Sequence, residues 1–460
     1  MKHVITIDFG STYTKIVIVD LIEKKIILSD KVPSTVGTDA SICLRQCFEL
    51  AKTVLSEDEL VRAKKLASSS AAGGLRMSVV GLTKSLSTFA GKAAALGAGA
   101  KIIANYSGVL TDEMVHEIEK SKTEIILLGG GYERGNISMV LANANRLAHS
   151  RIKIPIIYSG NSQLCQDIRK IMRAHHKKCF TVENIISDFG VLNVEPAQDV
   201  IRNLFLDHIT DMKGFNIVKK EFNNQFIPTP MAVLTAGTLL NKGTDNTEGL
   251  GPLLIVDIGG ATTDVYSFGE NKSFEGAKLV GLEEPFEKRT VEGDLGMRES
   301  SGGVINGDYI NVVIEDLGIA KEQLKKSIQN RINNIDYLPD CEMEVRIDDA
   351  IAKLAVYTAL RRHAGRVKPS YSKKCQNIQL GKNISEVSKV IGTGGILVHN
   401  HNPSEIMKSA EKKHGDKGIL VPDTVETYLD TEYVLFSAGL LKEIDEEAAI
   451  EIMLKSIRRC

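Results

Sequence analysis

The pattern of hydrophobic and polar positions predicts two closely similar β-hairpins, 249 positions apart. Residues 7–19 read IDFGSTYTKIVIV and residues 256–268 read VDIGGATTDVYSF. In both, an apolar run ends in an Asp, a turn rich in Gly, Ser and Thr follows, and a β-branched run comes next. Short strands rich in Val and Ile around a glycine turn are typical of a hairpin. A single stretch of this kind indicates an ordinary structural hairpin. Two stretches that align without a gap favour the interpretation that both hairpins have the same function.

The turns carry chemistry that a plain hairpin does not need. The alignment places Asp8 on Asp257 and Gly10 on Gly259. Hydroxyl side chains surround each turn, and glycine lets backbone N–H groups approach a ligand closely. Successive N–H groups in a concave turn bind anions, and an adjacent Asp can hold a metal ion through water. The sequence therefore predicts phosphate and metal binding at both turns.

Between the hairpins, strand-like and helix-like patterns alternate. Residues 1–32 predict a β-meander and residues 41–54 a helix. From about residue 62, alternation predicts parallel strands joined by crossover helices. The predicted strands are Met77–Val80, Lys101–Asn105, Ile125–Leu128, Ile154–Tyr158 and Phe180–Val182, and the predicted helices are 83–97, 111–120, 137–149 and 162–176.

Further helices are predicted at 196–212 and 348–364, and from about 431 to the end with an interruption near Gly439. Residues 241–251 are polar and Gly-rich, as in a linker. We therefore predict a first lobe at 1–250, with an inserted Rossmann-like α/β segment at about 62–185, and a second lobe at 251–460. The loop LLGGGYERGN at 127–136 is a candidate anion site, although close backbone packing explains its glycines equally well.

Composition narrows the function classes. The chain has 460 residues, 43% hydrophobic and 25% charged, with a net charge of −1. No basic stripe indicates nucleic acid or a membrane surface, and no apolar stretch approaches the roughly 20 residues that span a bilayer. The seven cysteines are scattered without a CxxC pair, which favours free thiols and a cytoplasmic location.

These motifs resemble those of the actin-like ATPase superfamily, which includes sugar kinases, actin and heat-shock chaperones. Its members have a phosphate-binding hairpin at the start of each of two related domains and a Gly-rich turn that meets the adenosine. The segment VIGTGGILV at 390–398 supplies that third element in the expected order. The resemblance implies an α/β, two-lobed actin-like ATPase (ribonuclease H-like) fold with an inserted parallel α/β segment.

A narrower resemblance covers essentially the whole chain. The sequence is similar to the MutL/GlmL family, accessory proteins of adenosylcobalamin-dependent glutamate mutase. The similarity rests on the opening IDFGSTYTK and on the following segments: SSAAGGLRM (69–77), GAGAKIIANYSG (97–108), ILLGGGYERGN (126–136), LIVDIGGATTDVYS (254–267), KRTVEGDLGMR (288–298) and VIGTGGIL (390–397). One departure lies at Tyr132-Glu133-Arg134, where the family often has a small Gly-rich turn, and this puts a ligand role for that loop in doubt.

The resemblance implies ATP/ADP and Mg²⁺ as ligands, in a cleft between the two lobes. Asp8 and Asp257 would hold the metal ion, and Asp8, Asp257 and Asp264 are the candidate catalytic residues, with Asp188 a poorer candidate. Asp264 can equally be a strand-end side chain that caps its own turn. The candidate nucleotide-binding residues are Gly10, Ser11, Thr12, Lys15, Gly259, Gly260, Ala261, Thr262, Thr263, Gly392, Gly394 and Gly395.

The implied function is ATP-dependent reactivation of an adenosylcobalamin-dependent mutase, with glutamate mutase or a related aminomutase as partner. The DxHxxG string whose His ligates cobalt in such mutases does not occur, so no permanently bound cobalamin is expected. We expect the partner to contact segments 62–185 and 287–303, although the alternating charges of 287–303 also fit a salt-bridged surface loop. Two alternatives stay open, a small-molecule kinase of the same superfamily and a non-hydrolysing, nucleotide-gated scaffold subunit.

Overall fold

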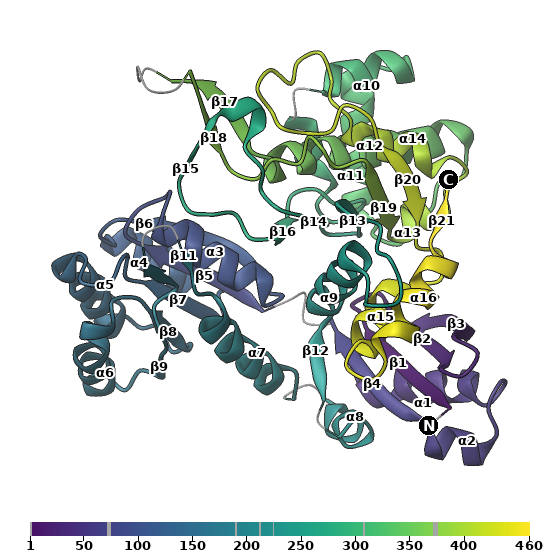
Figure 1. Ribbon diagram of the computed structural model, residues 1–460, viewed down its shortest axis with the longest axis horizontal. Coiled ribbons are helices and arrows are strands. Elements are labelled where there is room, and N and C mark those ends of the chain that lie inside the picture. Colours follow the sequence, from purple (N-terminus) through teal and green to yellow (C-terminus); the bar gives the residue numbers. More distant parts are fainter. Residues whose placement is uncertain are drawn as a thin grey trace. The chain divides into compact units, whose positions relative to one another are not determined.

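The structure is a computed structural model that describes residues 2–70, 75–188, 191–210, 213–223, 225–306, 309–370 and 376–460 (Figure 1). Residues 71–74 of the segment 69–77 and Cys375 lie outside this range. The chain forms two compact units. The first comprises Met1–Thr235, Gly281–Glu283 and Phe436–Ala448, and the second comprises Ala236–Val280, Glu284–Leu435 and Ala449–Cys460.

The first unit contains a mixed five-stranded sheet built on the first hairpin. In spatial order its strands are β12 (Phe226–Pro228), β4 (Lys64–Ser69), β1 (His3–Phe9), β2 (Tyr13–Asp20) and β3 (Lys25–Pro33). β1, β2 and β3 form an antiparallel meander, and β4 and β12 run parallel to β1. All seven residues of β1 are buried, as expected for a central strand covered on both faces.

The second unit repeats this topology with the second hairpin. In spatial order its strands are β16 (Glu287–Glu292), β14 (Thr263–Phe268), β13 (Leu253–Ile258), β19 (Lys389–Thr393), β20 (Glu426–Leu429) and β21 (Arg458–Arg459). β13, β14 and β16 are antiparallel neighbours, while β19 and β20 run parallel to β13. The five strands from β16 to β20 therefore correspond one to one with β3, β2, β1, β4 and β12.

A second sheet of the first unit confirms the predicted alternation of strands and helices. Its parallel strands, in spatial order, are β6 (Lys101–Ser107), β5 (Arg76–Gly81), β7 (Ile125–Gly129), β8 (Ile156–Ser159) and β9 (Cys179–Thr181). The connecting helices are α3 (Ser87–Gly97), α4 (Asp112–Lys120), α5 (Ile137–His149) and α6 (Cys165–Ala174), preceded by the 3₁₀ turn Ser162–Leu164. β4 lies within the predicted insert but pairs with β1, so the inserted sheet begins only at β5.

Local sequence explains these elements. β7 is buried at all five positions because neighbouring strands and helices cover both its faces, which suits its uniformly apolar sequence. Helix α5 begins where the Asn136 side chain accepts the N–H of Met139, an N-cap. Its buried residues Val140, Ala144 and Leu147 recur at helical spacing and pack in a cluster with Leu128 of β7.

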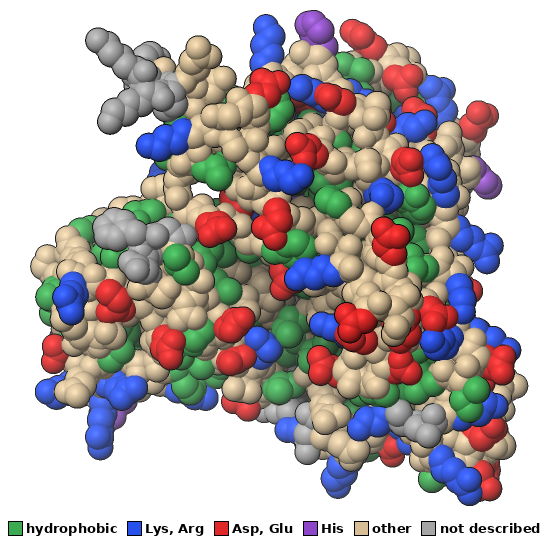
Figure 2. All heavy atoms as spheres, viewed as in Figure 1, with side chains coloured by type: hydrophobic (Ala, Val, Ile, Leu, Met, Phe, Trp, Pro, Cys, Tyr) green, Lys and Arg blue, Asp and Glu red, His purple; other side chains and the backbone are tan. Residues whose placement is uncertain are grey.

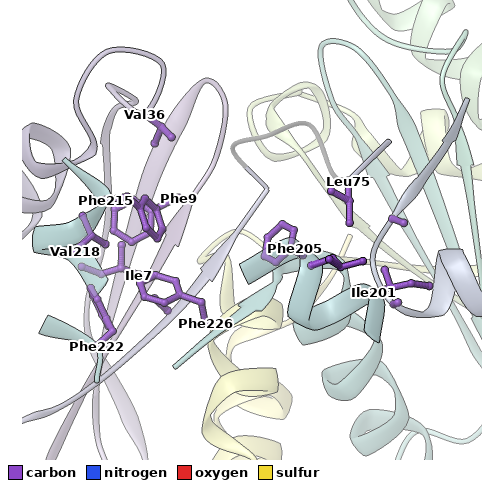
Figure 3. Close-up of a cluster of buried hydrophobic side chains, with 14 of the residues drawn as sticks. Ile7, Phe9, Val36, Leu75, Ile201, Phe205, Phe215, Val218, Phe222 and Phe226 are labelled. Carbon is purple, nitrogen blue, oxygen red and sulfur yellow. The ribbon is translucent and has the colours of Figure 1, made fainter. Parts of the chain in front are cut away.

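The first unit also contains several helices and a separate two-stranded antiparallel sheet. These elements include α1 (Ala40–Ala51), α2 (Glu57–Arg62), β10 (Ile186–Asp188), β11 (Val191–Leu192), α7 (Glu195–Thr210), α8 (Phe215–Glu221) and the start of α9 (Thr229–Lys242). Figure 3 shows the aromatic rings that meet beneath the first hairpin, and the ring of Phe9 lies 5.9 Å from that of Phe215 and 6.1 Å from that of Phe222, both edge-on. Edge-on aromatic pairs add to the stability that burial supplies.

The second unit packs around one long helix, α12 (Glu342–His363), which begins six residues before the predicted start at 348. The other elements are the 3₁₀ turn Phe274–Gly276, β15 (Lys278–Val280), the 3₁₀ turn Ser301–Asn306, α10 (Ile310–Leu317), α11 (Lys321–Asn333), β17 (Arg366–Pro369), β18 (Asn377–Leu380), α13 (Gly395–Val398), α14 (Pro403–Met407) and the 3₁₀ turn Lys408–Ala410. Twelve residues of α12 are buried. The prediction missed residues 342–347 (EMEVRI), where charged and apolar positions alternate in a pattern that does not indicate a helix.

The C-terminal region consists of α15 (Val434–Leu441) and α16 (Glu446–Ser456). The predicted interruption occurs at residues 442–445, between these two helices, rather than at Gly439 itself, which lies inside α15. A Cβ atom at Gly439 would lie 1.9 Å from the carbonyl oxygen of Ala232. This glycine therefore serves close packing of helix against backbone rather than helix termination.

Acidic and basic side chains are interspersed over the face shown in Figure 2, without an extended patch of one sign. This agrees with the near-zero net charge. Across the described ranges, every helix is too short or too polar to cross a membrane.

Candidate nucleotide site

Asp8 is anchored at the end of the first strand of the first hairpin. It is 2% exposed, and it lies opposite Ser68 in the parallel register of β1 and β4. The Ser68 hydroxyl donates to Asp8 Oδ1 at 2.9 Å, and the Thr229 hydroxyl donates to the same oxygen. Neither hydroxyl was predicted from the sequence. Ser68 could have been found as a hydroxyl residue at the carboxyl end of a parallel strand.

The first turn is closed by backbone contacts that demand glycine. The Gly10 N–H donates to the Tyr13 carbonyl at 3.2 Å, and a Cβ atom on Gly10 would lie 2.5 Å from that oxygen. Ser34, which follows β3, secures the other side. Its hydroxyl donates to the Gly10 carbonyl at 2.7 Å and its N–H to the Thr12 carbonyl at 2.9 Å.

The second turn repeats this geometry. The Gly259 N–H donates to the Thr262 carbonyl at 2.9 Å, the counterpart of the bond from Gly10 to Tyr13. Here the segment after β16 closes the turn. The Met297 N–H donates to the Gly259 carbonyl at 3.0 Å and the Arg298 N–H to the Gly260 carbonyl at 2.8 Å. The sequence repeat is thus a repeat of backbone hydrogen bonding as well.

Both turns present N–H groups that the protein itself does not use. In the described parts of the chain, no hydrogen bond involves the N–H groups of Ser11, Thr12, Gly260 or Ala261. Ser11, Thr12 and Gly260 are exposed, and Ala261 is half-buried. Successive N–H groups turned toward solvent form an anion-binding concavity. Each turn can therefore accept phosphate oxygens, with an Asp at its edge.

The third predicted element lies beside Asp257, within the second unit. Asp257 is half-buried and pairs with Thr393 in the register of β13 and β19. Gly394 has a φ of +98°, and a Cβ atom there would lie 2.3 Å from the Ile258 carbonyl and 3.0 Å from Asp257 Oδ1. Glycine is required at this position because the turn lies directly against the end of β13.

The structure places most of the predicted nucleotide-binding residues at the two turns, and it places two of them in the interior of the second unit. In the first unit Asp8, Gly10, Ser11 and Thr12 form one group, and Lys15 is half-buried opposite Asp8 in the hairpin. In the second unit the group comprises Asp257, Gly259, Gly260, Ala261, Thr262, Gly394 and the exposed Gly395. Two residues face the interior of the second unit instead. Gly392 leaves room for Met407 and Leu397, and the Thr263 hydroxyl donates to the Leu295 carbonyl at 2.6 Å.

Asp264 takes part in a largely buried ion pair. Arg289, 7% exposed, donates to Asp264 Oδ1 from Nε at 2.8 Å and from Nη2 at 2.6 Å. The Thr262 hydroxyl donates to the other carboxylate oxygen at 3.2 Å. These contacts match the turn-capping alternative, and a water-orienting role for Asp264 stays a prediction. The side chain of Asp188 lies outside the described residues.

The charged segment 287–303 is held by its own unit. Lys288 pairs with Glu284, Arg289 with Asp264, and Arg298 with Asp348. Arg362 of α12 binds both Glu292 and Asp294. The alternating charges therefore have partners within the second unit, as in the salt-bridged alternative, and a partner-binding role for this segment stays a prediction.

The glycine loop at 126–136 packs against the loop that follows β8. A Cβ atom at Gly130 would lie 2.8 Å from Gly160 Cα. The carboxylate of Glu133 accepts the Ser162 hydroxyl at 2.8 Å and the Asn184 amide at 2.9 Å. Close backbone packing, the alternative considered from the sequence, accounts for these contacts.

The duplicated sheets, each opening with an Asp-Gly hairpin turn, define the ribonuclease H-like fold of the actin-like ATPase superfamily, here with an inserted parallel α/β segment. This confirms the predicted fold class. A family model described as "MutL protein" matches residues 4–457. "Protein MutL" of Clostridium tetanomorphum is 39% identical over 457 residues, covering 99% of each chain. The chain therefore belongs to the MutL protein family, which confirms the resemblance seen in the sequence.

Solved structures show only distant likeness. Xylulose kinase from Bifidobacterium adolescentis matches with 11% identity and a TM-score of 0.32, over 98% of this chain and 93% of that one. The ethanolamine utilization protein EutJ from Carboxydothermus hydrogenoformans matches with 10% identity and a TM-score of 0.27, over 96% and 89%. The fold assignment accordingly rests on the strand topology given above.

Proposed function

We propose that the protein binds ATP with Mg²⁺ through its two hairpin turns and serves as an ATP-dependent reactivating factor for an adenosylcobalamin-dependent mutase, with glutamate mutase as the first candidate. The observation that carries the nucleotide proposal is the repeated turn with unused N–H groups beside an Asp. Membership of the MutL protein family supports the accessory role.

The side chains present fit Mg²⁺ and phosphate. Carboxylate, hydroxyl and water oxygens are the ligands that Mg²⁺ prefers, and Asp8 and Asp257 supply such carboxylates. The ion would neutralise phosphate charge during hydrolysis. The N–H groups of Ser11 and Thr12 in one turn, and of Gly260 and Ala261 in the other, would bind phosphate oxygens. Ser68 and Thr229 would orient the Asp8 carboxylate through the hydrogen bonds that they donate.

To release a damaged cobalamin from a mutase, the reactivating factor must supply free energy that weakens the binding of that cofactor. To weaken cofactor binding a thousandfold, the reactivating factor must contribute about 4 kcal/mol of coupling between its nucleotide state and the mutase. Nucleotide must then favour one state of the protein strongly, because equal affinity for both states shifts nothing.

The test is phosphate release from ATP and Mg²⁺ by the purified protein, alone and with glutamate mutase inactivated by cyanocobalamin. We expect hydrolysis that rises with the inactivated mutase and falls at least about a hundredfold in Asp257→Asn, because the variant loses a carboxylate that holds the metal. Asp423→Asn, at a side chain that is 84% exposed, is the matched control and should retain activity.

Each alternative predicts a distinct result. Binding of ATP without hydrolysis under any condition would refute the ATPase mechanism and favour a nucleotide-gated scaffold. Hydrolysis that the mutase leaves unchanged, together with phosphorylation of an added polyol or acid, would favour a small-molecule kinase.

A further inference from the structure

The second hairpin turn is connected to the helices of its own unit through one segment, residues 293–298, here called the bracket. Its Met297 and Arg298 N–H groups bind the Gly259 and Gly260 carbonyls. A Cβ atom at Gly296 would lie 2.5 Å from the Gly260 carbonyl oxygen, so the two backbones are in direct contact. The turn therefore cannot change shape without moving the bracket.

The Arg298 side chain carries this connection onward. Its Nε donates to the Tyr337 carbonyl at 3.1 Å. Its Nη2 donates to Asp348 Oδ2 at 3.0 Å, and Nη1 donates to Asp348 Oδ1 at 3.2 Å. One guanidinium group thus holds both the loop before α12 and the first half of α12. A planar fork of this kind fixes direction as well as distance.

The next contact is buried. Arg331 of α11 is 0% exposed, and its Nε donates to Asp348 Oδ1 at 2.6 Å. Its Nη1 donates to Glu344 Oε2 at 2.7 Å, and its guanidinium lies 5.2 Å from the ring centroid of Tyr337. Asp348, which is 3% exposed, accepts hydrogen bonds from both arginines. Displacement of Arg298 would therefore remove two hydrogen bonds from a buried carboxylate, a cost that favours rearrangement of this group.

The loop held by Arg298, residues 334–341, is exposed to solvent. Ile335 is 63% exposed and Leu338 is 78% exposed. The loop ends at Cys341, an exposed free thiol immediately before α12. Movement of the Tyr337 carbonyl would therefore change a surface of the protein, and Cys341 provides a chemical probe of that surface.

We propose that Arg298 is a positioning residue that couples nucleotide at the turn Gly259–Thr262 to the exposed loop 334–341 and to α12. The inference rests on the proposed binding of ATP at this turn. It explains why the bracket combines a glycine that touches the turn with an arginine directed at the helices. It also gives the accessory role a physical route, because a surface that responds to nucleotide can regulate contact with another protein.

The test follows alkylation of Cys341 by iodoacetamide, measured by peptide mass spectrometry on the full chain, with and without ATP and Mg²⁺. Cys460, which is also exposed, is the internal control. We expect ATP to change the Cys341 rate about fivefold or more and to leave the Cys460 rate unchanged. Equilibrium dialysis on the same samples measures ATP binding independently.

Variants then test whether the response of Cys341 to ATP depends on the Arg298 side chain. Arg298→Met should still bind ATP but lose the Cys341 response, and Arg298→Lys should restore part of it. Arg346→Met is the matched control, because Arg346 is an exposed arginine of α12 that donates to the Asp316 carbonyl at 3.0 Å and does not contact the bracket in the described residues. It should retain the full response.

The outcomes separate the two proposals. ATP binding without a Cys341 response, or a full response in Arg298→Met, would overturn the coupling and leave nucleotide binding intact. No ATP binding by the wild-type protein would overturn both. If Arg298→Met does not fold, ATP affinity is measured instead on the wild-type chain with a bulky maleimide attached to Cys341. The coupling predicts that this modification changes ATP affinity about fivefold or more. An unchanged affinity would refute the coupling.

Discussion

At the scale of single residues, some buried polar side chains of the second unit have partners that local sequence does not reveal. His363, the last residue of α12, is fully buried. Its Nε2 lies 2.8 Å from the Ser267 hydroxyl and its Nδ1 lies 2.9 Å from the Thr290 hydroxyl. Burial, together with the positive charges of Lys288 and Lys382, holds the pKa of His363 well below its ordinary value.

This depressed pKa makes stability depend on pH in a definite direction. Below about pH 6.5 the unfolded chain takes up a proton at His363 that the folded chain does not, so the free energy of unfolding falls as pH falls. The loss from this one group between pH 7.5 and pH 5.5 is on the order of 1 kcal/mol. We expect His363→Gln to have a lower free energy of unfolding than the wild type at pH 7.5. We also expect that free energy to fall less in the variant than in the wild type between pH 7.5 and pH 5.5.

Urea unfolding at the two pH values measures the difference. His116→Gln, at a side chain that is 60% exposed, is the control and should keep the wild-type dependence on pH. An identical change in stability between pH 7.5 and 5.5 for the wild type and His363→Gln would show that His363 is not the group responsible.

At the scale of elements, helix α8 shows how one helix divides between core and solvent. Phe215 is 0% exposed, and its ring lies 5.9 Å from Phe9 of β1 and 5.1 Å from Phe226 of β12 (Figure 3). Ile217, two residues later on the same helix, is 56% exposed. The packed rings of Phe9, Phe215 and Phe226 therefore hold α8 against β1, the strand that contains Asp8.

Truncation of these two residues should give very different results. Phe215→Ala removes a buried ring and should lower the free energy of unfolding by about 3–5 kcal/mol. Ile217→Ala should change it by no more than about 0.5 kcal/mol, because its side chain is largely in water already. Chemical denaturation of both variants tests this, and equal losses would show that Phe215 does not anchor the sheet.

The predicted elements that proved correct share strong local signals. Helix α5 spans the predicted residues 137–149, because an N-cap Asn precedes an apolar stripe of regular spacing. The misplaced boundaries lack such signals. Charged and apolar positions alternate in residues 342–347 at the start of α12, and Gly439 resembles a helix breaker although it serves close contact with Ala232.

At the scale of the whole molecule, nucleotide that binds only the folded chain must stabilise it. At an ATP concentration of 100 times the Kd, this stabilisation is about 2.7 kcal/mol. We expect ATP with Mg²⁺ to raise the Tm of the wild-type protein, and we expect both Asp8→Asn and Asp257→Asn to lose most of that shift. These substitutions keep side-chain size but remove the carboxylate charge that the metal ion requires.

Thermal denaturation of the three proteins with ATP and either Mg²⁺ or EDTA makes the comparison. A full shift in either variant would exclude that Asp from metal binding. A shift that persists in EDTA would show that the nucleotide binds without the ion.

The sequence by itself determined the duplicated hairpin, the alternating α/β insert and the resemblance to an ATPase family. These features are local or repeat one another, so periodicity and alignment are sufficient to detect them. Only the tertiary structure decided which side chains meet across the chain. Ser68 and Thr229 reach Asp8, Arg289 reaches Asp264, and Arg298 reaches Asp348. Each pair joins residues 25 to 221 positions apart, and such contacts follow from strand register and helix packing rather than from any local pattern.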